Sequence, residues 1–342
     1  MTERATGERA VRATVLGSGA WGTTFAAVLA DAGCDVTVWG RSAATCEQIA
    51  REHRNEAYLP GVRLPDGVTA TTDARAALAD ADLVAIAIPS QSARAALEPL
   101  RDAFPAGAVA VSLMKGVELA TDRRMSQVVA EALGLPDERV AVVSGPNLAR
   151  EIAQRQPTAT VVASSSDATA RLVAQACASS YFRPYTNDDV VGVELCGAVK
   201  NVIALAVGMS QGRGLGFNTM ATVITRGLVE ITRLGLALGA DADTFPGLAG
   251  MGDLMATCAS PDSRNHTLGV HLGQGMTLAQ AIEATGGTAE GVKSSRSVLE
   301  LATSVGVEMP ITAAVVQVVH EGLPVDRLAS LLLARPHKAE GV

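Results

Sequence analysis

Aromatic side chains are scarce in this sequence, at 3% of its 342 residues. A core with so few of them must be built largely from Ala, Val, Leu and Ile. The hydrophobic fraction of 48%, beside 18% charged residues, is normal for a globular protein and argues against a disordered chain. Because the length exceeds what one ordinary core requires, we expect two domains.

Excess positive charge is also missing. The chain has 28 basic and 35 acidic side chains and a formal net charge of −7. This balance weighs against a nucleic-acid partner and against binding to anionic membrane surfaces. A basic residue at a place where an anionic ligand could bind is therefore more informative here than in a basic protein.

Paired cysteines and long apolar runs are absent as well. The five cysteines are scattered, odd in number and without a C-x-x-C pair, which is typical of a reduced cytoplasmic protein rather than a disulfide scaffold or zinc site. The polar start of the chain lacks the apolar region of a secretory signal. Apolar stretches such as residues 202–209 are too short to span a membrane. These features predict a cytoplasmic protein with no metal and no membrane span.

Short apolar runs alternate with helical patterns in the first half of the chain. The expected strands are Val11–Leu16, Asp35–Trp39, Leu83–Ile88, Val109–Leu113, Val140–Val143 and Thr158–Val162. The expected helices between them are Trp21–Ala32, Ser42–Arg54, Gln91–Leu100 and Arg123–Leu133. This alternation predicts right-handed crossovers and a mostly parallel sheet covered on both faces, an α/β fold of the doubly wound Rossmann class.

The pattern changes after about residue 189. Residues 190–333 are helical nearly throughout, and Pro184 and Asn187 interrupt regular structure just before them. We therefore expect a dinucleotide-binding Rossmann domain over residues 1–188. An all-helical, substrate-binding domain should follow over residues 189–342.

A glycine-rich motif, Gly17-Ser18-Gly19-Ala20-Trp21-Gly22, directly follows the first strand and opens the first helix. Gly17 would permit the tight turn, Gly19 the approach of backbone to a pyrophosphate, and Gly22 the packing of helix on strand. The bare N–H groups at the helix N-terminus would bind the phosphates. The motif alone could be an ordinary turn, but strand, helix and second strand follow in the required order. It predicts an NAD(P) cofactor.

The end of the second strand bears on the choice of cofactor. An NAD-selective site usually has Asp or Glu there, whereas this sequence has Gly40-Arg41-Ser42. Arg41 could pair with a 2′-phosphate and stack on adenine, which favours NADPH, with use of both cofactors left open. The alternative is a solvated loop arginine.

Lys200 lies in an otherwise apolar helical stretch, residues 197–203. Reduction of a ketone by hydride leaves an oxyanion that must be protonated, so such a site needs a positioned acid. Burial would lower the pKa of Lys200 toward neutrality and suit it to proton exchange. The alternative is a lysine that extends from one polar edge of the helix into solvent.

Other polar strings could complete a site. Asp253 lies in Gly250-Met251-Gly252-Asp253-Leu254, where the glycines indicate backbone close to a ligand or a plain turn. Ser263-Arg264-Asn265 could bind phosphate and hydroxyl groups, or could simply cap a helix. Lys115-Gly116 and Gly145-Pro146-Asn147 each follow an expected strand, at the edge where open parallel sheets bind ligands.

Two histidines fit no metal site. His266 and His271 are five residues apart, a spacing that does not share one helix face, and no acidic partner accompanies them. We expect both to be surface residues.

Taken together, these strings resemble bacterial-type NAD(P)-dependent glycerol-3-phosphate dehydrogenases, from Val15 to about Thr312. The matching strings are residues 16–23, Ile88-Pro89-Ser90, Lys115-Gly116, Ser144-Gly145-Pro146-Asn147, Gly197-Ala198-Val199-Lys200-Asn201, Thr225-Arg226-Gly227, Gly250-Met251-Gly252-Asp253-Leu254, Ser263-Arg264-Asn265 and Glu290-Gly291. Ordered matches at this density are far more specific than the glycine turn alone.

The resemblance implies reversible reduction of dihydroxyacetone phosphate to sn-glycerol 3-phosphate for phospholipid synthesis, by a homodimer. Lys200 would exchange the proton with the C2 oxygen. The substrate would be held by Lys115, Gly145, Asn147, Asp253, Ser263, Arg264 and Asn265. Besides the glycine turn, the cofactor would contact Trp21, Arg41, Lys115, Ala149, Arg264 and Glu290.

Two other functions stay open at this point. A β-hydroxyacid or 6-phosphogluconate-type dehydrogenase also joins a Rossmann domain to a helical one and uses a Lys–Asn site. A non-catalytic NAD(P)H-sensing module is the second alternative, because a fold does not fix its chemistry. The combination of Lys200, Asp253 and Arg264 favours an enzyme, since a sensor would not need it.

Overall fold

The structure, a computed structural model, describes residues 9–286 and 289–327. Their contacts form two compact units. We call Met1–Met114 with Met125–Val190 the sheet unit, and Lys115–Arg124 with Val191–Val342 the helical unit. A single domain boundary after residue 188 stays a prediction, and by contacts the short segment Lys115–Arg124 groups with the helical unit.

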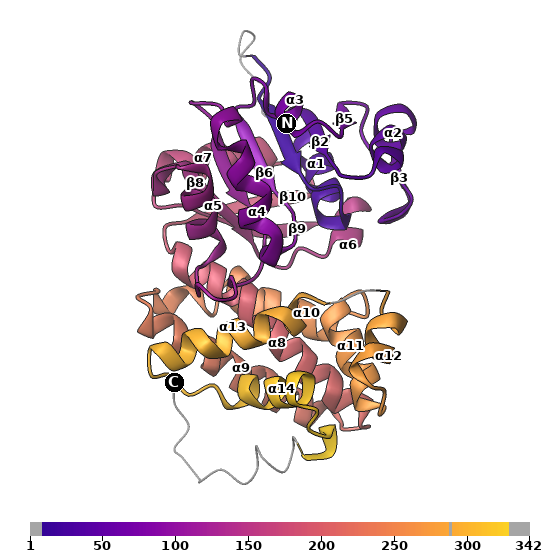
Figure 1. Cartoon of the computed structure of the whole chain (residues 1–342), viewed down its shortest axis with the longest axis vertical. Coiled ribbons are helices and arrows are strands. Elements are labelled where there is room, and N and C mark those ends of the chain that lie inside the picture. Colours follow the sequence, from indigo (N-terminus) through magenta and orange to yellow (C-terminus); the bar gives the residue numbers. More distant parts are fainter. Residues whose placement is uncertain (1–8, 287–288, 328–342) are drawn as a thin grey trace. The chain divides into compact units, whose positions relative to one another are not determined.

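The sheet unit is built on a twisted, mostly parallel sheet (Figure 1). Within the described residues the strands are β1 (Arg12–Leu16), β2 (Asp35–Trp39), β5 (Val68–Thr71), β6 (Leu83–Ile86), β7 (Val109–Ser112), β8 (Val140–Ser144), β9 (Thr158–Ala163) and β10 (Phe182–Asn187), with a side hairpin of β3 (Arg54–Asn55) and β4 (Leu59–Arg63). The spatial order is β10-β9-β8-β7-β6-β1-β2-β5, and only the β8–β9 pair is antiparallel. The Rossmann-type fold predicted from the sequence is thereby confirmed.

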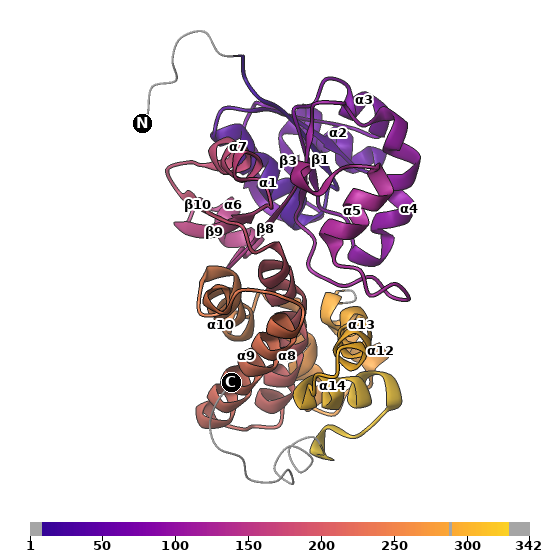
Figure 2. The ribbon, with the colours of Figure 1, turned by 90° about the vertical axis from the view of Figure 1, so that its left-hand side faces the viewer.

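Helices cover both faces of this sheet (Figure 2). Successive strand residues point to opposite faces, so Val15 belongs to the core under α1 and Leu16 to the core under α4 and α5. The helical elements are α1 (Ala20–Asp31), α2 (Ala43–Glu52), α3 (Ala74–Leu78), η1 (Ser90–Ser92), α4 (Ala93–Leu97), η2 (Glu98–Ala103), α5 (Met125–Leu133), η3 (Asp137–Arg139), α6 (Ala149–Ala153) and α7 (Asp167–Cys177).

One expectation about chain breaks is wrong. Pro184 does not interrupt regular structure but lies inside β10, in parallel register with β9, whereas Asn187 is the residue at which β10 ends. The reason is that β10 is an edge strand of the sheet. A proline on an edge strand can turn its missing N–H side toward solvent without loss of a ladder hydrogen bond.

The helical unit consists of helices packed around one long central helix, α8 (Val190–Gly212). The others are α9 (Phe217–Ala237), η4 (Ala242–Thr244), the π-type turn η5 (Leu248–Gly252), α10 (Asp253–Ala259), α11 (Arg264–Gly273), α12 (Leu278–Ala284), α13 (Glu290–Ser304) and α14 (Pro310–Glu321). Residues 328–333 of the expected helical pattern lie outside the described residues.

The central helix α8 is longer than the apolar stretch of residues 202–209 that was noted in the sequence. Among the described residues, α8 has the length and composition that could cross a bilayer. However, 89% of its most apolar window is buried inside the protein. Its apolar side chains are therefore explained by the core of the helical unit.

A buried carboxylate stabilises the start of α14. Glu230 of α9 is 3% exposed and accepts hydrogen bonds from Ile311 N (2.5 Å), Thr312 N (3.2 Å) and Thr312 Oγ1 (3.1 Å). The helix's own N-cap residue, Met309, provides no side-chain cap. Glu230 thus satisfies backbone donors that α14 cannot satisfy itself, with a negative charge at the positive helix end.

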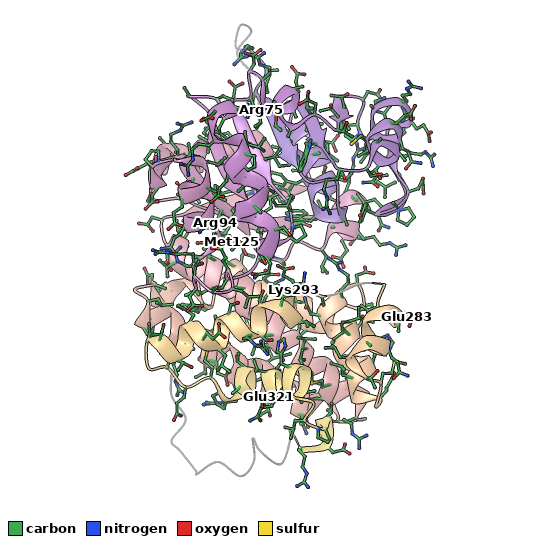
Figure 3. All side chains as sticks on the ribbon, in the orientation of Figure 1. Arg75, Arg94, Met125, Glu283, Lys293 and Glu321 are labelled. Atoms are coloured by element: carbon green, nitrogen blue, oxygen red, sulfur yellow. The ribbon has the colours of Figure 1, made fainter. Side chains whose placement is uncertain are left out.

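We expect Glu230→Ala to lower the free energy of unfolding by about 2 to 4 kcal/mol, because several buried donors lose a charged acceptor. Chemical denaturation measures this change. Glu283→Gln and Glu321→Gln are matched controls, since these carboxylates lie exposed on α12 and at the end of α14 (Figure 3). A loss for Glu230→Ala no larger than for the controls would contradict the capping role.

Candidate active site

The glycine-rich turn joins β1 to α1 and meets strict steric demands. Gly17 has φ +126°, and a Cβ there would lie 2.4 Å from Ala87 O. A Cβ on Gly22 would lie 2.1 Å from Gly17 O. At Gly19, the N-cap of α1, a Cβ would meet no protein atom within 4 Å, and no side chain caps the helix. Protein packing thus explains Gly17 and Gly22, whereas Gly19 leaves an open, uncapped helix end that fits a pyrophosphate.

Asn55 braces this turn, and the sequence analysis missed it. The side chain lies in β3, fully buried, and its Nδ2 donates to Ser18 O (2.9 Å) and to Thr23 Oγ1 (2.8 Å). These bonds fix the carbonyl in the middle of the glycine motif. No sequence signal pointed to Asn55, because β3 is only two residues long and its hairpin was not expected.

The other predicted cofactor residues of the sheet unit lie near strand ends and helix starts. Trp21 follows Ala20 in the first turn of α1, and its buried Nε1 has no hydrogen-bond partner among the described residues. Arg41 is exposed just after β2, next to the N-cap of α2, and makes no ion pair in the part of the chain described. Ala149 begins α6, and its carbonyl accepts from Thr24 Oγ1 of α1 (3.1 Å).

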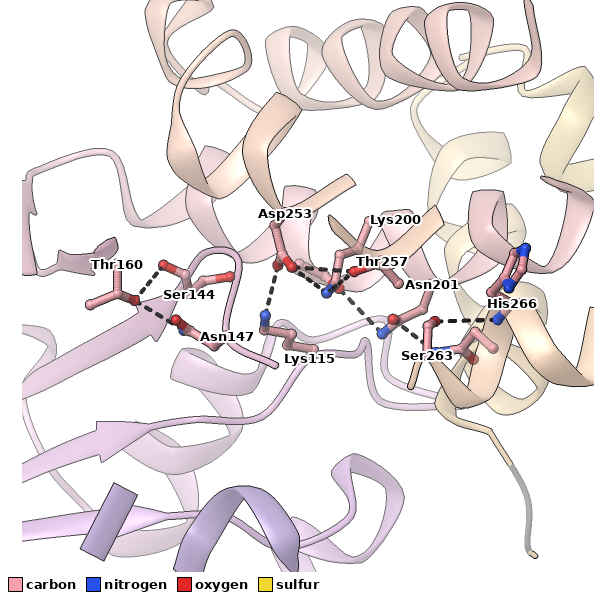
Figure 4. A network of polar contacts seen from close by, with 12 residues as sticks. Lys115, Ser144, Asn147, Thr160, Lys200, Asn201, Asp253, Thr257, Ser263 and His266 are labelled. Atoms are coloured by element: carbon pink, nitrogen blue, oxygen red, sulfur yellow. Dashed lines mark hydrogen bonds and ion pairs between the residues drawn. The ribbon is translucent and has the colours of Figure 1, made fainter. Parts of the chain in front are cut away.

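A second polar group lies at the carboxyl end of β8. Gly145 has φ +142°, outside the range that side chains favour. Asn147 Nδ2 donates to Thr160 Oγ1 (3.0 Å), which in turn donates to Ser144 O (3.0 Å; Figure 4). Two buried polar atoms, Asn147 Oδ1 and Ser144 Oγ, lack a partner within residues 9–286 and 289–327. Such unsatisfied groups are costly unless a ligand or water pairs with them.

In the helical unit, Lys200 points inward and not to solvent. It is 6% exposed on α8. Its Nζ donates to Asp253 Oδ1 and to Thr257 Oγ1, the latter at 2.6 Å (Figure 4). Asp253 is 1% exposed and begins α10, where the helix N-terminus favours its negative charge. The alternative of a lysine extended into solvent is therefore wrong.

A second lysine shares the same carboxylate. Lys115 Nζ donates to Asp253 Oδ2 at 2.6 Å, and its side chain is 16% exposed. Two ammonium groups thus converge on one carboxylate, which gives the cluster a net charge of +1 when all three groups are ionised. Thr257, which contacts both Lys200 and Asp253, was missed because a threonine in an apolar helix gives no distinctive signal.

Burial is the main influence on the proton affinity of Lys200. Desolvation lowers the pKa of Lys200 to about 8, although the charge of Asp253 opposes the decrease. The positive charge of Lys115 lowers the pKa further. Near pH 8 this amine can therefore both release and accept a proton, as a general acid–base group must.

In the predicted string 263–265, the side chains of Ser263 and Asn265 form hydrogen bonds within the helical unit. Ser263 is the N-cap of α11 and accepts from His266 N (3.3 Å), so the capping alternative holds for this hydroxyl. Asn265 donates from Nδ2 to Asn201 Oδ1 (2.9 Å) and accepts from Gly291 N (2.8 Å), which ties α8, α11 and α13 together. Glu290, another predicted cofactor residue, begins α13 beside that glycine.

Arg264, between those two residues, is exposed. It begins α11, and it has no hydrogen-bond or ion-pair partner among the described residues. A cation in the first turn of a helix faces the positive end of the helix dipole, which is unfavourable. An anionic ligand beside both would remove this conflict.

The structure corrects the expectation for one histidine. His266 is not a surface residue but is 7% exposed, with Nε2 2.7 Å from Gln211 Oε1. Burial also lowers the pKa of His266. The prediction failed because it considered only metal spacing, whereas the position faces α8 from α11.

Comparison with known proteins identifies both halves of the chain. Residues 12–170 match the family model of the NAD-dependent glycerol-3-phosphate dehydrogenase N-terminus, and residues 189–330 match that of the C-terminus. A glycerol-3-phosphate dehydrogenase [NAD(P)+] of Streptomyces griseus is 57% identical over 330 residues, covering 96% of this chain and 98% of that protein. The protein of the same name from Corynebacterium diphtheriae is 54% identical over 327 residues, covering 95% and 99%.

Solved structures give the same result. The crystal structure of glycerol-3-phosphate dehydrogenase from Coxiella burnetii has a TM-score of 0.90 at 36% identity and covers 95% of this chain and 99% of that one. The yeast glycerol-3-phosphate dehydrogenase structure has a TM-score of 0.81 at 29% identity, with the same coverage. A D-mandelate dehydrogenase with a TM-score of 0.62 is only 14% identical, a likeness of fold alone.

Proposed function

The chain belongs to the NAD-dependent glycerol-3-phosphate dehydrogenase family, and from this premise we propose how its own residues carry out the reaction. The enzyme transfers hydride reversibly between NAD(P)H and dihydroxyacetone phosphate, giving sn-glycerol 3-phosphate. The family match supports neither a β-hydroxyacid dehydrogenase nor a non-catalytic sensor.

The observation that carries this proposal is the buried Lys200–Asp253–Lys115 cluster. When bound, the nicotinamide supplies or accepts the hydride at C2 of the substrate. Lys200 then exchanges the proton with the C2 oxygen, as donor in reduction and acceptor in oxidation. Asp253 keeps the ammonium oriented, and the cationic cluster stabilises negative charge that develops on the oxygen.

The substrate phosphate needs cationic and N–H donors. We assign this role to Arg264, which is exposed and unpaired within the described residues, together with Lys115. Ser263 and Asn265, on either side of Arg264, are proposed as further substrate contacts, and Ser263 also caps α11. In the sheet unit, Gly145 and Asn147 are proposed as further substrate contacts, and the buried Oδ1 of Asn147 lacks a partner among the described residues.

The chain's own residues fit a dinucleotide. The open end of α1 at Gly19 would receive the pyrophosphate, and the unpartnered Nε1 of Trp21 lies in the same turn. Ala149, Arg264 and Glu290 are proposed as further contacts. The curated relatives are named as enzymes that use either NAD or NADP. We propose that Arg41 shifts the balance toward NADPH through the 2′-phosphate.

Replacement of Arg41 tests this preference. We expect Arg41→Ala to lower kcat/KM for NADPH by about 10- to 100-fold and to change kcat/KM for NADH by less than about threefold, because only NADPH has the 2′-phosphate. Arg51→Ala is the matched control, since Arg51 is an exposed arginine of α2 that pairs with Glu47. Equal effects of Arg41→Ala on both cofactors would show that Arg41 does not select NADPH.

The activity itself is tested by following the near-ultraviolet absorbance of NADPH after addition of dihydroxyacetone phosphate. We expect rapid oxidation with this substrate and little with a panel of keto acids. Turnover of a keto acid at a comparable kcat/KM would transfer the assignment to another class of dehydrogenase.

The resemblance to glycerol-3-phosphate dehydrogenases also bears on the assembly and cellular role of this chain. We propose a homodimer in the cytoplasm that supplies glycerol 3-phosphate for phospholipid synthesis. All five cysteines lie among the described residues, where they are buried and form no disulfide, which suits a reducing compartment. Light scattering of the purified chain at several concentrations tests the dimer.

A further inference from the structure

The segment Lys115–Arg124 is unusual in its packing. It lies in sequence between β7 and α5 of the sheet unit, but its contacts belong to the helical unit. Val117 is fully buried in the core of the helical unit. A β-bridge between Val117 and Arg124 closes the segment into a loop. The segment is therefore a built part of the helical unit rather than a surface connection.

Buried polar contacts with α8 and α13 fasten this segment. Arg124 Nη1 lies 2.5 Å from Glu194 Oε2 of α8, and the side chains are only 18% and 4% exposed. Ser297 Oγ of α13 donates to Val117 O at 3.0 Å and is fully buried. A buried ion pair and a buried hydroxyl are sensitive to loss of one partner, because the other is left unsatisfied.

The first residue of the same segment is Lys115, which binds Asp253 beside Lys200. We propose that Arg124, Glu194 and Ser297 are positioning residues for the proposed dehydrogenase reaction. They hold residues 115–124 on the helical unit so that Lys115 Nζ stays within hydrogen-bond distance of Asp253 Oδ2. None of the three needs to touch the substrate or cofactor.

The position of Lys115 matters because few charges face the Lys200 amine. These are Asp253 from α10 and Lys115 itself; Thr257 completes the hydrogen bonds of the amine, and the nearby Cys258 is a neutral thiol because burial raises its pKa. The Lys115 cation opposes a second positive charge next to it and so lowers the pKa of Lys200. If the segment shifts, Asp253 pairs with Lys200 alone, and the pKa of Lys200 rises.

Charge-removing variants separate positioning from a direct electrostatic effect. Loss of the Arg124 cation by Arg124→Gln would directly raise the pKa of Lys200, whereas loss of the Glu194 anion by Glu194→Gln would directly lower it. If both residues act by positioning, both variants raise it. Ser297→Ala removes no charge, so any shift that it causes comes from position alone.

The test is the pH dependence of kcat in both directions, measured on the full chain. In Arg124→Gln, Glu194→Gln and Ser297→Ala we expect the midpoint to move upward by about half to one pH unit. Below the midpoint, glycerol 3-phosphate oxidation then slows by about three- to tenfold, because oxidation needs the neutral amine. Reduction of dihydroxyacetone phosphate persists to higher pH.

Controls exclude a general disturbance of the fold. Arg124→Lys keeps the charge and should restore most of the wild-type profile. Arg171→Gln removes an exposed arginine paired with Asp167 on α7 and should leave the midpoint unchanged. The dissociation constant for NADPH should stay within about twofold in all variants. If Glu194→Gln does not fold, Ser297→Ala decides, since the removal of one hydroxyl is the milder change.

A downward shift in Glu194→Gln, or no shift in both Glu194→Gln and Ser297→Ala, would overturn the positioning role. Either result leaves the proposed function intact, provided that the wild type reduces dihydroxyacetone phosphate. An inactive wild type would instead overturn the proposed function.

Discussion

Replacing Lys200 with alanine is expected to lower turnover by about 10²- to 10⁴-fold while the dissociation constant for NADPH changes by less than about threefold. Lys200 belongs to the helical unit and the glycine turn to the sheet unit, so we expect the glycine turn to bind the cofactor in the variant as in the wild type. The Nζ of Lys200 is held by Asp253 and Thr257, and the other amine on Asp253 among the described residues is Lys115, which we assign to the substrate phosphate. The variant therefore loses the proton donor without a ready substitute.

Stopped-flow hydride transfer and fluorescence titration of NADPH measure the two quantities. Lys200→Met, closer in volume to lysine, excludes a cavity as the cause of the loss. Lys293→Ala is the matched control, because Lys293 is an exposed lysine of α13 (Figure 3). Turnover of Lys200→Ala close to that of the wild type would leave Lys200 as a structural residue only.

Replacing Arg264 with alanine is expected to lower kcat/KM for dihydroxyacetone phosphate by about 100-fold, because a guanidinium that pairs with phosphate on two N–H groups is lost. Stability should change little, since Arg264 is exposed and has no partner among the described residues. The kcat/KM of Arg264→Lys for dihydroxyacetone phosphate should lie between those of the wild type and Arg264→Ala, because lysine keeps the charge but not the two parallel N–H donors.

Unphosphorylated dihydroxyacetone provides the internal reference. Because it lacks the phosphate, its low kcat/KM should be nearly the same in the wild type and in Arg264→Ala. The preference for the phosphorylated substrate therefore collapses in the variant. A variant that keeps this preference would show that another group binds the phosphate.

Much of the sheet unit was predictable because its determinants are local. The strands at residues 12–16 and 35–39 were predictable from their apolar residues. The turn between the first strand and the first helix was predictable from its glycines. The strand β10 was not predicted, because its edge position, which tolerates Pro184, depends on the order of the whole sheet.

The sequence indicated which residues belong to the candidate site, but not which of them form hydrogen bonds with one another. Lys200 stood out as a lysine in an apolar helix, and Asp253 as an acid among glycines. Their hydrogen bond joins positions 53 residues apart in sequence, which no local pattern encodes. Asn55 and Glu194 were missed for the same reason, since each acts on a distant segment. Ser263 gave a local signal that fits both a helix cap and a ligand contact.

The most direct measurement of the central claim is the pH dependence of single-turnover hydride transfer in both directions, from about pH 6 to about pH 10. A Lys200 amine with a pKa of about 8 predicts opposite profiles. Reduction should fall and oxidation should rise through a shared midpoint near pH 8, and Lys200→Ala should lose both transitions. Profiles that run in the same direction, or that survive in Lys200→Ala, would contradict proton exchange by this lysine.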